Sequence, residues 1–108
     1  MKDPRRMGEA DLQRAILQTA ELMGYRAYHV VNVSDQLRNS TSVGFPDLCM
    51  VHPERRGAIF AELKDARRKV TRDQQLWLDA LSGAREEHYV WRPKDWKSGR
   101  IIKILEER

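Results

Sequence analysis

The feature that most restricts the fold is a pair of apolar stretches joined by a short turn. The first stretch covers residues 46–52, the second covers residues 57–64, and only residues 53–56 separate them. Both are rich in aliphatic and aromatic residues, which predicts two antiparallel strands in a hairpin. Apolar side chains fall on both faces of the two strands, a pattern typical of inner strands covered by helices on each side. We therefore expect this hairpin at the centre of a sheet.

Three charged residues lie at the outer ends of the hairpin. Facing residues in an antiparallel pair have a constant sum of residue numbers, and closing the turn pairs His52 with Gly57, a sum of 109. Asp47 and Glu62 have the same sum, so they should face each other. Because side chains alternate along a strand, Lys64 lies on the face of Glu62. Two acids and one base are thus expected to converge.

This convergence suggests a chemistry. Facing carboxylates about 5 Å apart repel by roughly 3 kcal/mol at an effective dielectric constant near 20. One lysine offsets part of the repulsion, whereas a divalent cation would remove it more completely. Oxygen ligands favour Mg²⁺, which usually takes one or two protein carboxylates, and a nearby ammonium group can orient an attacking water. Phosphodiester hydrolysis is one reading; an ordinary ion-pair cluster at the surface is the other.

Further elements surround the hairpin. Apolar residues recur at helical spacing after Glu9, and Thr71-x-x-Gln74 fits the capping box of another helix. In chain order we expect a helix over 9–23, strands over 25–33, 46–52 and 57–64, a helix over 71–83, a strand over 87–92 and a helix over 101–107, with an exposed loop over 34–44. This order predicts an α/β fold, a sheet flanked by helices, in a single domain over residues 1–108.

Composition narrows the class of protein. The chain has 108 residues, a net charge of +4 and a sequence pI near 9.5, which favours a polyanionic partner. Cys49 is the only cysteine, and the three histidines have no zinc-site spacing. The sequence shows neither an apolar run of about 20 residues nor a signal peptide. We expect a cytoplasmic protein with no membrane partner.

The motifs resemble a nuclease family. Pro46-Asp47 followed by Glu62-Leu63-Lys64 resembles the PD-(D/E)xK motif of the restriction-endonuclease-like superfamily. With GFPDL, AELK and the helix TRDQQLWL, the chain is similar to the small stand-alone VRR-NUC nucleases, many of them from phages. The segments GEADLQRAIL and YVWRP fit the same pattern, so the resemblance spans nearly the whole chain. It implies a restriction-endonuclease-like fold with a central mixed sheet.

The resemblance also implies roles for the hairpin residues. Asp47 and Glu62 would be metal ligands, with the backbone carbonyl of Leu63 as a third. Lys64 would position the nucleophilic water. The implied metal is Mg²⁺ or Mn²⁺.

Two helical residues are implied in the same site. Glu9 matches an acid that completes the metal site, although it could simply complement the positive end of its helix, and Asp11 could compete with it. Gln74 matches a glutamine near the site, although its capping-box role would also account for it. Asp65 is a further acid, which strand alternation sends to the opposite face.

Basic residues crowd into the segment after the second hairpin strand. We expect Arg67, Arg68, Lys69 and Arg72 to contact DNA, with Arg38 adding contacts from the exposed loop. The alternative is an ordinary solvated surface, the role expected for Arg55 and Arg56 at the far end of the hairpin.

These observations predict a metal-dependent endonuclease that hydrolyses DNA phosphodiesters, selective for four-way junctions or other branched DNA. Paired cuts on a four-way junction require two sites, which favours a homodimer. Two alternatives remain open. One is a catalytically silent DNA-binding subunit of a replication or repair complex, and the other is a nuclease acting on flap or single-stranded DNA, or on RNA.

Overall fold

The computed structural model describes residues 7–30 and 41–107. The part of the predicted strand and loop that falls on residues 31–40 lies outside the described residues. In chain order the elements are α1 (Glu9–Leu22), β1 (Arg26–His29), β2 (Leu48–Val51), β3 (Ile59–Leu63), α2 (Arg72–Gly83), β4 (Glu87–Trp91), α3 (Pro93–Lys97) and α4 (Arg100–Glu106).

The four described strands form one mixed sheet in the order β1-β2-β3-β4. β2 is antiparallel to both β1 and β3, whereas β3 and β4 are parallel. The hairpin strands are therefore the inner pair, as the sequence predicts. Leu48 pairs with Ala61 and Met50 with Ile59, and both pairs have the predicted residue-number sum of 109. The register inferred from the turn is confirmed.

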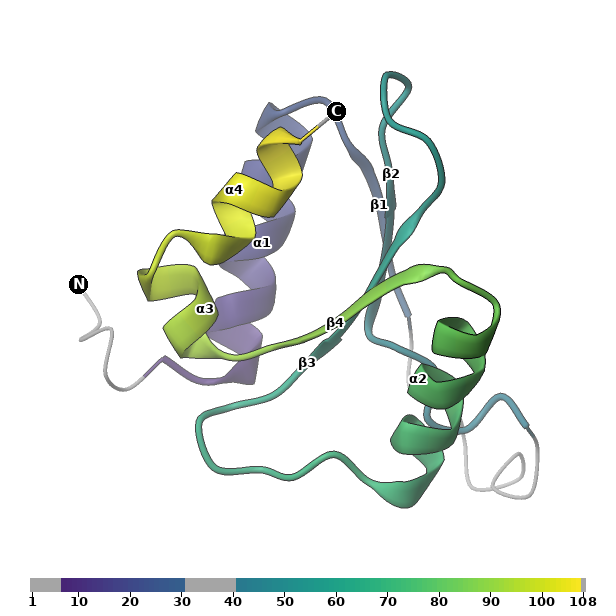
Figure 1. The fold of residues 1–108 in the computed structure, drawn as a ribbon. Coiled ribbons are helices and arrows are strands. Elements are labelled where there is room, and N and C mark those ends of the chain that lie inside the picture. Colours follow the sequence, from purple (N-terminus) through teal and green to yellow (C-terminus); the bar gives the residue numbers. More distant parts are fainter. Residues whose placement is uncertain (1–6, 31–40, 108) are drawn as a thin grey trace.

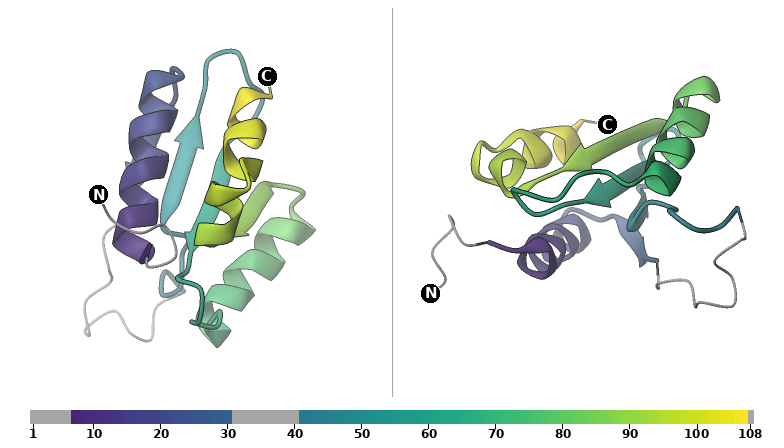
Figure 2. Two further views of the ribbon diagram at one scale, coloured as in Figure 1. Left: turned by 90° about the vertical axis from the view of Figure 1, so that its left-hand side faces the viewer. Right: turned by 90° about the horizontal axis from the view of Figure 1, so that it is seen from below.

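Helices cover both faces of the sheet. α1, α3 and α4 lie together on one side and α2 lies on the other (Figure 1), and α1 and α4 run beside each other across the sheet (Figure 2). The inner strands turn fully buried residues toward the three-helix side, where each large aliphatic side chain stabilises the fold by about 1.5–3 kcal/mol. This core includes Leu12, Ile16, Ala20, Leu48, Met50, Ile59, Ala61, Leu63, Ile101 and Leu105. No helix of the described residues is long and apolar enough to cross a membrane.

The short helix α3 is the main addition to the predicted order. The sequence predicts that Pro93 ends the fourth strand, and in the structure the same residue also begins α3. Proline suits the first helical position because its missing N–H would have no partner there. The carboxylate of Asp95 accepts a hydrogen bond of 2.8 Å from the backbone N–H of Arg92, which fixes the turn from strand into helix. The terminal helix then begins at Arg100.

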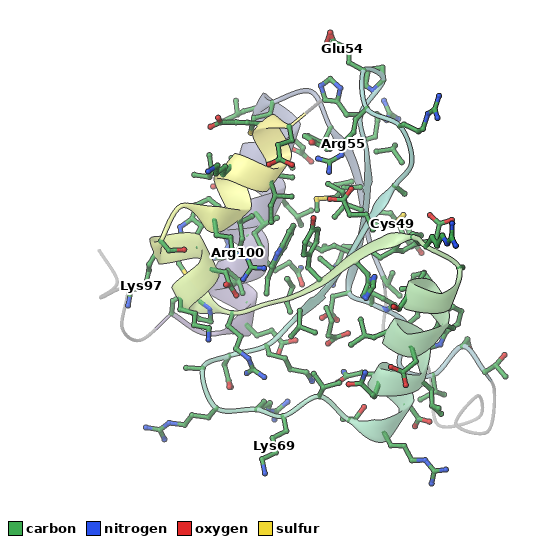
Figure 3. The ribbon with its side chains drawn as sticks, viewed as in Figure 1. Cys49, Glu54, Arg55, Lys69, Lys97 and Arg100 are labelled. Carbon is green, nitrogen blue, oxygen red and sulfur yellow. The ribbon has the colours of Figure 1, made fainter. Side chains whose placement is uncertain are left out.

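Arg55 ties the hairpin turn to the C-terminal helix, although the sequence predicts a surface role for it. Its Nη1 donates to the carbonyl oxygens of Ile104 at 2.8 Å and Glu107 at 3.1 Å and to the hydroxyl of Tyr25 at 3.2 Å. Its Nη2 donates to both carboxylate oxygens of Glu87. Figure 3 shows Arg55 between the hairpin and α4, and its side chain is only 11% exposed.

Replacing this arginine should destabilise the fold. We expect Arg55→Ala to lower the free energy of unfolding by about 3 kcal/mol, because it leaves Glu87 without its cation and two carbonyls without a donor. Arg56→Ala is the matched control, since Arg56 is exposed and its loss should change stability by less than about 0.5 kcal/mol. Urea unfolding of both variants measures the difference. Equal effects would contradict the structural role.

Candidate active site

The structure brings the predicted site residues together from four elements. Asp47 immediately precedes β2, Glu62 and Leu63 lie in β3, and Lys64 follows directly. Glu9 opens α1, and Gln74 lies in the first turn of α2. The antiparallel register places Asp47 opposite Glu62, and the helices bring their residues to the same end of the hairpin.

Glu62 is the most buried acid of the site. Its side chain is 2% exposed, and its Oε2 accepts a hydrogen bond of 3.0 Å from Nε2 of Gln74. Burial, a hydrogen bond that the protonated Glu62 carboxyl donates to the Asp47 carboxylate, and the charge of Asp47 raise the pKa of Glu62 to about 9. The carboxyl of Glu62 therefore holds a proton at neutral pH when no cation balances it. An ordinary surface ion-pair cluster does not have this degree of burial.

Lys64 is buried beside this carboxyl. Its Nζ lies 3.8 Å from Oε2 of Glu62, and its side chain is 6% exposed. The backbone N–H of Lys64 donates to the carbonyl of Trp91 at 3.0 Å, which anchors the lysine to the neighbouring strand β4. The ammonium group is therefore held in a fixed, mostly dry position.

Asp47 is half-buried and held across the hairpin. Its Oδ2 accepts a hydrogen bond of 2.8 Å from the backbone N–H of Leu63. This bond orients the carboxylate toward the end of β3, where Glu62 and Lys64 lie. The proposed metal-binding role of the Leu63 carbonyl stays a prediction.

Glu9 shares the electrostatic environment of the site. Burial raises the pKa of Glu9, and the charge of Asp47 raises it further while Lys64 opposes the shift. Asp11 has a different role: its Oδ2 accepts a hydrogen bond of 3.2 Å from the N–H of Gly8 and its Oδ1 lies 3.5 Å from Arg14. The geometry therefore favours Glu9 over Asp11 as the third acid, and its function as a ligand stays a prediction.

Gln74 fills both roles that the sequence allows. Its Oε1 accepts from the N–H of Thr71 at 2.9 Å, and its own N–H donates to the Thr71 hydroxyl at 3.2 Å, which completes the capping box. Its Nε2 remains to donate to Glu62. One side chain thus starts the helix and orients the buried acid.

Gly44, a residue that the sequence did not single out for its own role, joins the loop before Asp47 to α2. A Cβ at this position would lie 2.5 Å from the carbonyl carbon of Asp73 and 2.7 Å from the nitrogen of Gln74. Gly44 also has a φ of +88°, which favours glycine. The glycine of GFPDL is visible in the sequence and could have indicated a close backbone contact. Its contact partner, however, lies about thirty residues away in the chain, so the sequence does not identify that partner.

Aromatic residues add to this contact between the loop before Asp47 and α2, which we call the loop–α2 contact. The ring of Phe45 packs edge-on against Trp77 at 4.8 Å and against Phe60 at 6.0 Å between ring centroids. Nε1 of Trp77 donates to the carbonyl of Thr41 at 2.7 Å. The loop that leads into Asp47 is therefore packed against the helix that carries Gln74.

The basic residues after β3 are exposed at the site end of the sheet. We call them the basic segment: Arg67, Arg68, Lys69 and Arg72. Lys69 extends away from the loop (Figure 3). Arg38 lies outside the described residues. Asp65 lies beyond the end of β3, where its carboxylate hydrogen-bonds to backbone N–H groups.

The donor chemistry fits a divalent cation. Asp47, Glu62 and Glu9 offer hard oxygen ligands, and a bound cation would replace the proton that burial and like charge retain on Glu62. Within the residues that the structure describes, no three acid, histidine or cysteine side chains are already grouped to hold a metal ion. A pair of carboxylates is nevertheless enough for Mg²⁺, which keeps several waters.

The mixed four-stranded sheet and its flanking helices form the predicted α/β fold, which carries the acids and the lysine at one end of the hairpin. The model of the VRR-NUC domain family matches residues 7–93, and the chain belongs to this family. Its members are nucleases that act on DNA, and they generally depend on divalent metals.

A structural comparison supports the fold. The chain is similar to a solved structure described as "VRR_NUC domain protein", with a TM-score of 0.62 and 18% sequence identity over 80% of this chain and 78% of that chain. No curated protein matches the sequence. The shared fold agrees with the family membership.

A methyl group at Gly44 should disturb the loop–α2 contact. Gly44→Ala should separate α2 from the loop and weaken the hydrogen bond between Gln74 and Glu62, whereas Gly57→Ala is a matched control. Gly57 also has a positive φ, of +76°, but nothing lies within 4 Å of an added Cβ. Both variants carry the left-handed cost of about 1–2 kcal/mol.

Two measurements separate these effects. Urea unfolding should show a larger loss of stability for Gly44→Ala than for Gly57→Ala. The NMR signals of the Gln74 side-chain amide, assigned by their absence in Gln74→Ala, should shift only in Gly44→Ala. Unchanged amide signals in Gly44→Ala would contradict the claim that the loop–α2 contact positions Gln74.

Proposed function

We propose that the protein is an endonuclease that depends on Mg²⁺ or Mn²⁺ and hydrolyses DNA phosphodiester bonds. The observation that carries this proposal is the buried carboxyl of Glu62, which has Asp47 opposite it and Lys64 3.8 Å away. A buried acid with a raised pKa beside a fixed lysine is typical of a catalytic site. Membership in a nuclease family supports the same conclusion.

Each residue has a role in this proposal. Asp47 and Glu62 would hold the metal, with Glu9 and the Leu63 carbonyl as further ligands. When bound, the metal would stabilise charge on the phosphate and activate water. The ammonium group of Lys64 orients the attacking water and stabilises developing negative charge, and its burial strengthens that effect.

The substrate proposal rests on the basic segment. Its side chains are exposed at the site end of the sheet, where they can contact phosphates on either side of the cleaved bond. Such contacts read the path of the backbone rather than the base sequence. We propose branched DNA, in particular a four-way junction, as the preferred substrate.

A homodimer follows from the same substrate. One chain supplies one site, and symmetric cuts on a four-way junction require two sites related by a two-fold axis. We propose a cytoplasmic homodimer in which each protomer cuts one strand.

The central test is cutting by active-site variants. Purified protein should nick a labelled four-way junction only with Mg²⁺ or Mn²⁺, and Glu62→Gln or Lys64→Ala should lower the rate by about 10²-fold or more. Binding, measured with Ca²⁺ in place of the active metal, should stay within about threefold of wild type, a difference of less than 1 kcal/mol. Circular dichroism checks that both variants fold.

Linear duplex, flap and single-stranded DNA and RNA complete the substrate panel. Undiminished cutting by both variants would contradict the assigned roles. Binding without cutting under every metal would favour the accessory DNA-binding subunit. Faster cutting of flap or single-stranded substrates than of the junction would overturn the proposed selectivity.

The basic segment should determine the salt dependence of binding. The double variant Arg67→Ala/Arg68→Ala should weaken junction binding and reduce the slope of log affinity against log salt by roughly 0.9 per lost phosphate contact. Arg100→Ala/Lys103→Ala is the charge-matched control, because it also removes two positive charges and both residues are exposed on α4, away from the basic segment. The same slope for wild type and the double variant would exclude these arginines from the DNA interface.

A further inference from the structure

Two side chains fix the backbone that carries the basic segment. Oδ1 of Asp65 accepts hydrogen bonds from the backbone N–H groups of Arg67 at 2.8 Å and Arg68 at 2.7 Å. On the other side, Nη1 of Arg92 donates to the carbonyl oxygens of Asp65 and Arg68, both at 2.7 Å. In the turn from Asp65 to Arg68, the carboxylate of Asp65 therefore binds backbone N–H groups, and the guanidinium of Arg92, next to the sheet, binds backbone carbonyl oxygens.

Arg92 connects this turn to the rigid part of the fold. It directly follows β4, and its backbone N–H is bound by Asp95 at the start of α3. Its guanidinium is used for backbone carbonyls of the turn, so the exposed cations of the segment extend from a backbone that is anchored to the sheet.

Fixing this backbone before DNA arrives changes the cost of binding. An exposed turn with three successive cations would otherwise sample many conformations, and ordering each residue costs backbone conformational entropy. Hydrogen bonds already present in the free protein remove that cost from the binding step. The side chains at positions 67–69 then meet phosphates with their spacing set.

We propose that Asp65 and Arg92 are positioning residues that pre-order the basic segment as a phosphate-binding surface for the DNA backbone. This inference rests on the proposed function and extends it, since neither residue has to touch DNA. It makes an unusual claim about Asp65: a negative charge placed among cations improves DNA binding.

Charge alone and positioning predict opposite results for Asp65. If only charge mattered, removing the carboxylate would strengthen binding to DNA. Asp65→Asn and Asp65→Ala remove the same charge, but asparagine keeps an oxygen acceptor for the two N–H groups and alanine does not. The comparison between these two variants therefore isolates the hydrogen bonds from the charge.

The experiment measures the affinity of wild type and both variants for a fluorescein-labelled four-way junction with Ca²⁺ in place of the active metal. We expect Asp65→Asn to bind as tightly as wild type or more tightly, and Asp65→Ala to bind about tenfold more weakly than Asp65→Asn, the equivalent of reordering about one residue. Amide hydrogen exchange at Arg67 and Arg68 should accelerate in Asp65→Ala. Asp65→Ala that binds as tightly as Asp65→Asn would overturn the inference.

A second pair of variants tests Arg92. Arg92→Ala should weaken binding at least about fivefold more than Arg100→Ala, which removes an equal charge from α4, because only Arg92 holds the turn. Equal losses in these two variants would also overturn the inference. Wild-type protein that binds no junction would instead contradict the proposed function, whereas binding by wild type with no difference within either pair rejects the positioning role alone.

Discussion

A carboxyl group buried to 2% exposure and facing a second carboxyl is unfavourable unless its surroundings compensate for it, and Glu62 is in that position. Gln74 donates to its oxygen, Lys64 supplies a nearby cation, and a retained proton removes its charge when no metal balances it. Gln74 comes from α2, whereas Lys64 directly follows the strand that carries Glu62, and Asp47 precedes β2. The fold must hold these parts in register for the site to exist.

The two faces of the sheet differ in their side chains, and this difference meets the requirement. The three-helix side contains the fully buried aliphatic core, so the register of the hairpin is fixed there by packing. The opposite face carries Glu62, which Gln74 of α2 contacts, and among the described helices it is α2 that covers this face (Figure 1). Because α2 contacts the loop at Gly44 through its backbone, the helix that brings Gln74 is located by a close approach of two main chains. Stability and chemistry thus depend on different faces of the same two strands.

The sequence was sufficient where local rules apply. The short turn sets the register of β2 and β3, and alternation then places the charged residues, so the facing pair follows from counting. It was insufficient where a contact joins distant segments. Arg55 reaches α4 about fifty residues later, and Gly44 touches α2, and neither partner leaves a periodic signal. Helix α3 was missed because proline ends a strand and begins a helix with equal ease.

The arrangement of charge explains how an acidic site could receive a polyanion. The acids of the site are buried or half-buried, whereas the cations of the basic segment are exposed in the stretch of chain that follows β3. Under the proposed function, a proton or a divalent cation on these acids would reduce the repulsion that an incoming phosphate meets, and the exposed arginines would attract the phosphate from solution. Metal binding and DNA binding should then favour each other, because each brings the charge that the other lacks. The local position of each charge should then matter more for DNA binding than the net charge of +4. An ionised, exposed acid repels DNA. Glu62 avoids this repulsion when a proton or a metal neutralises it, and Asp65 offsets it by ordering the backbone of the basic segment.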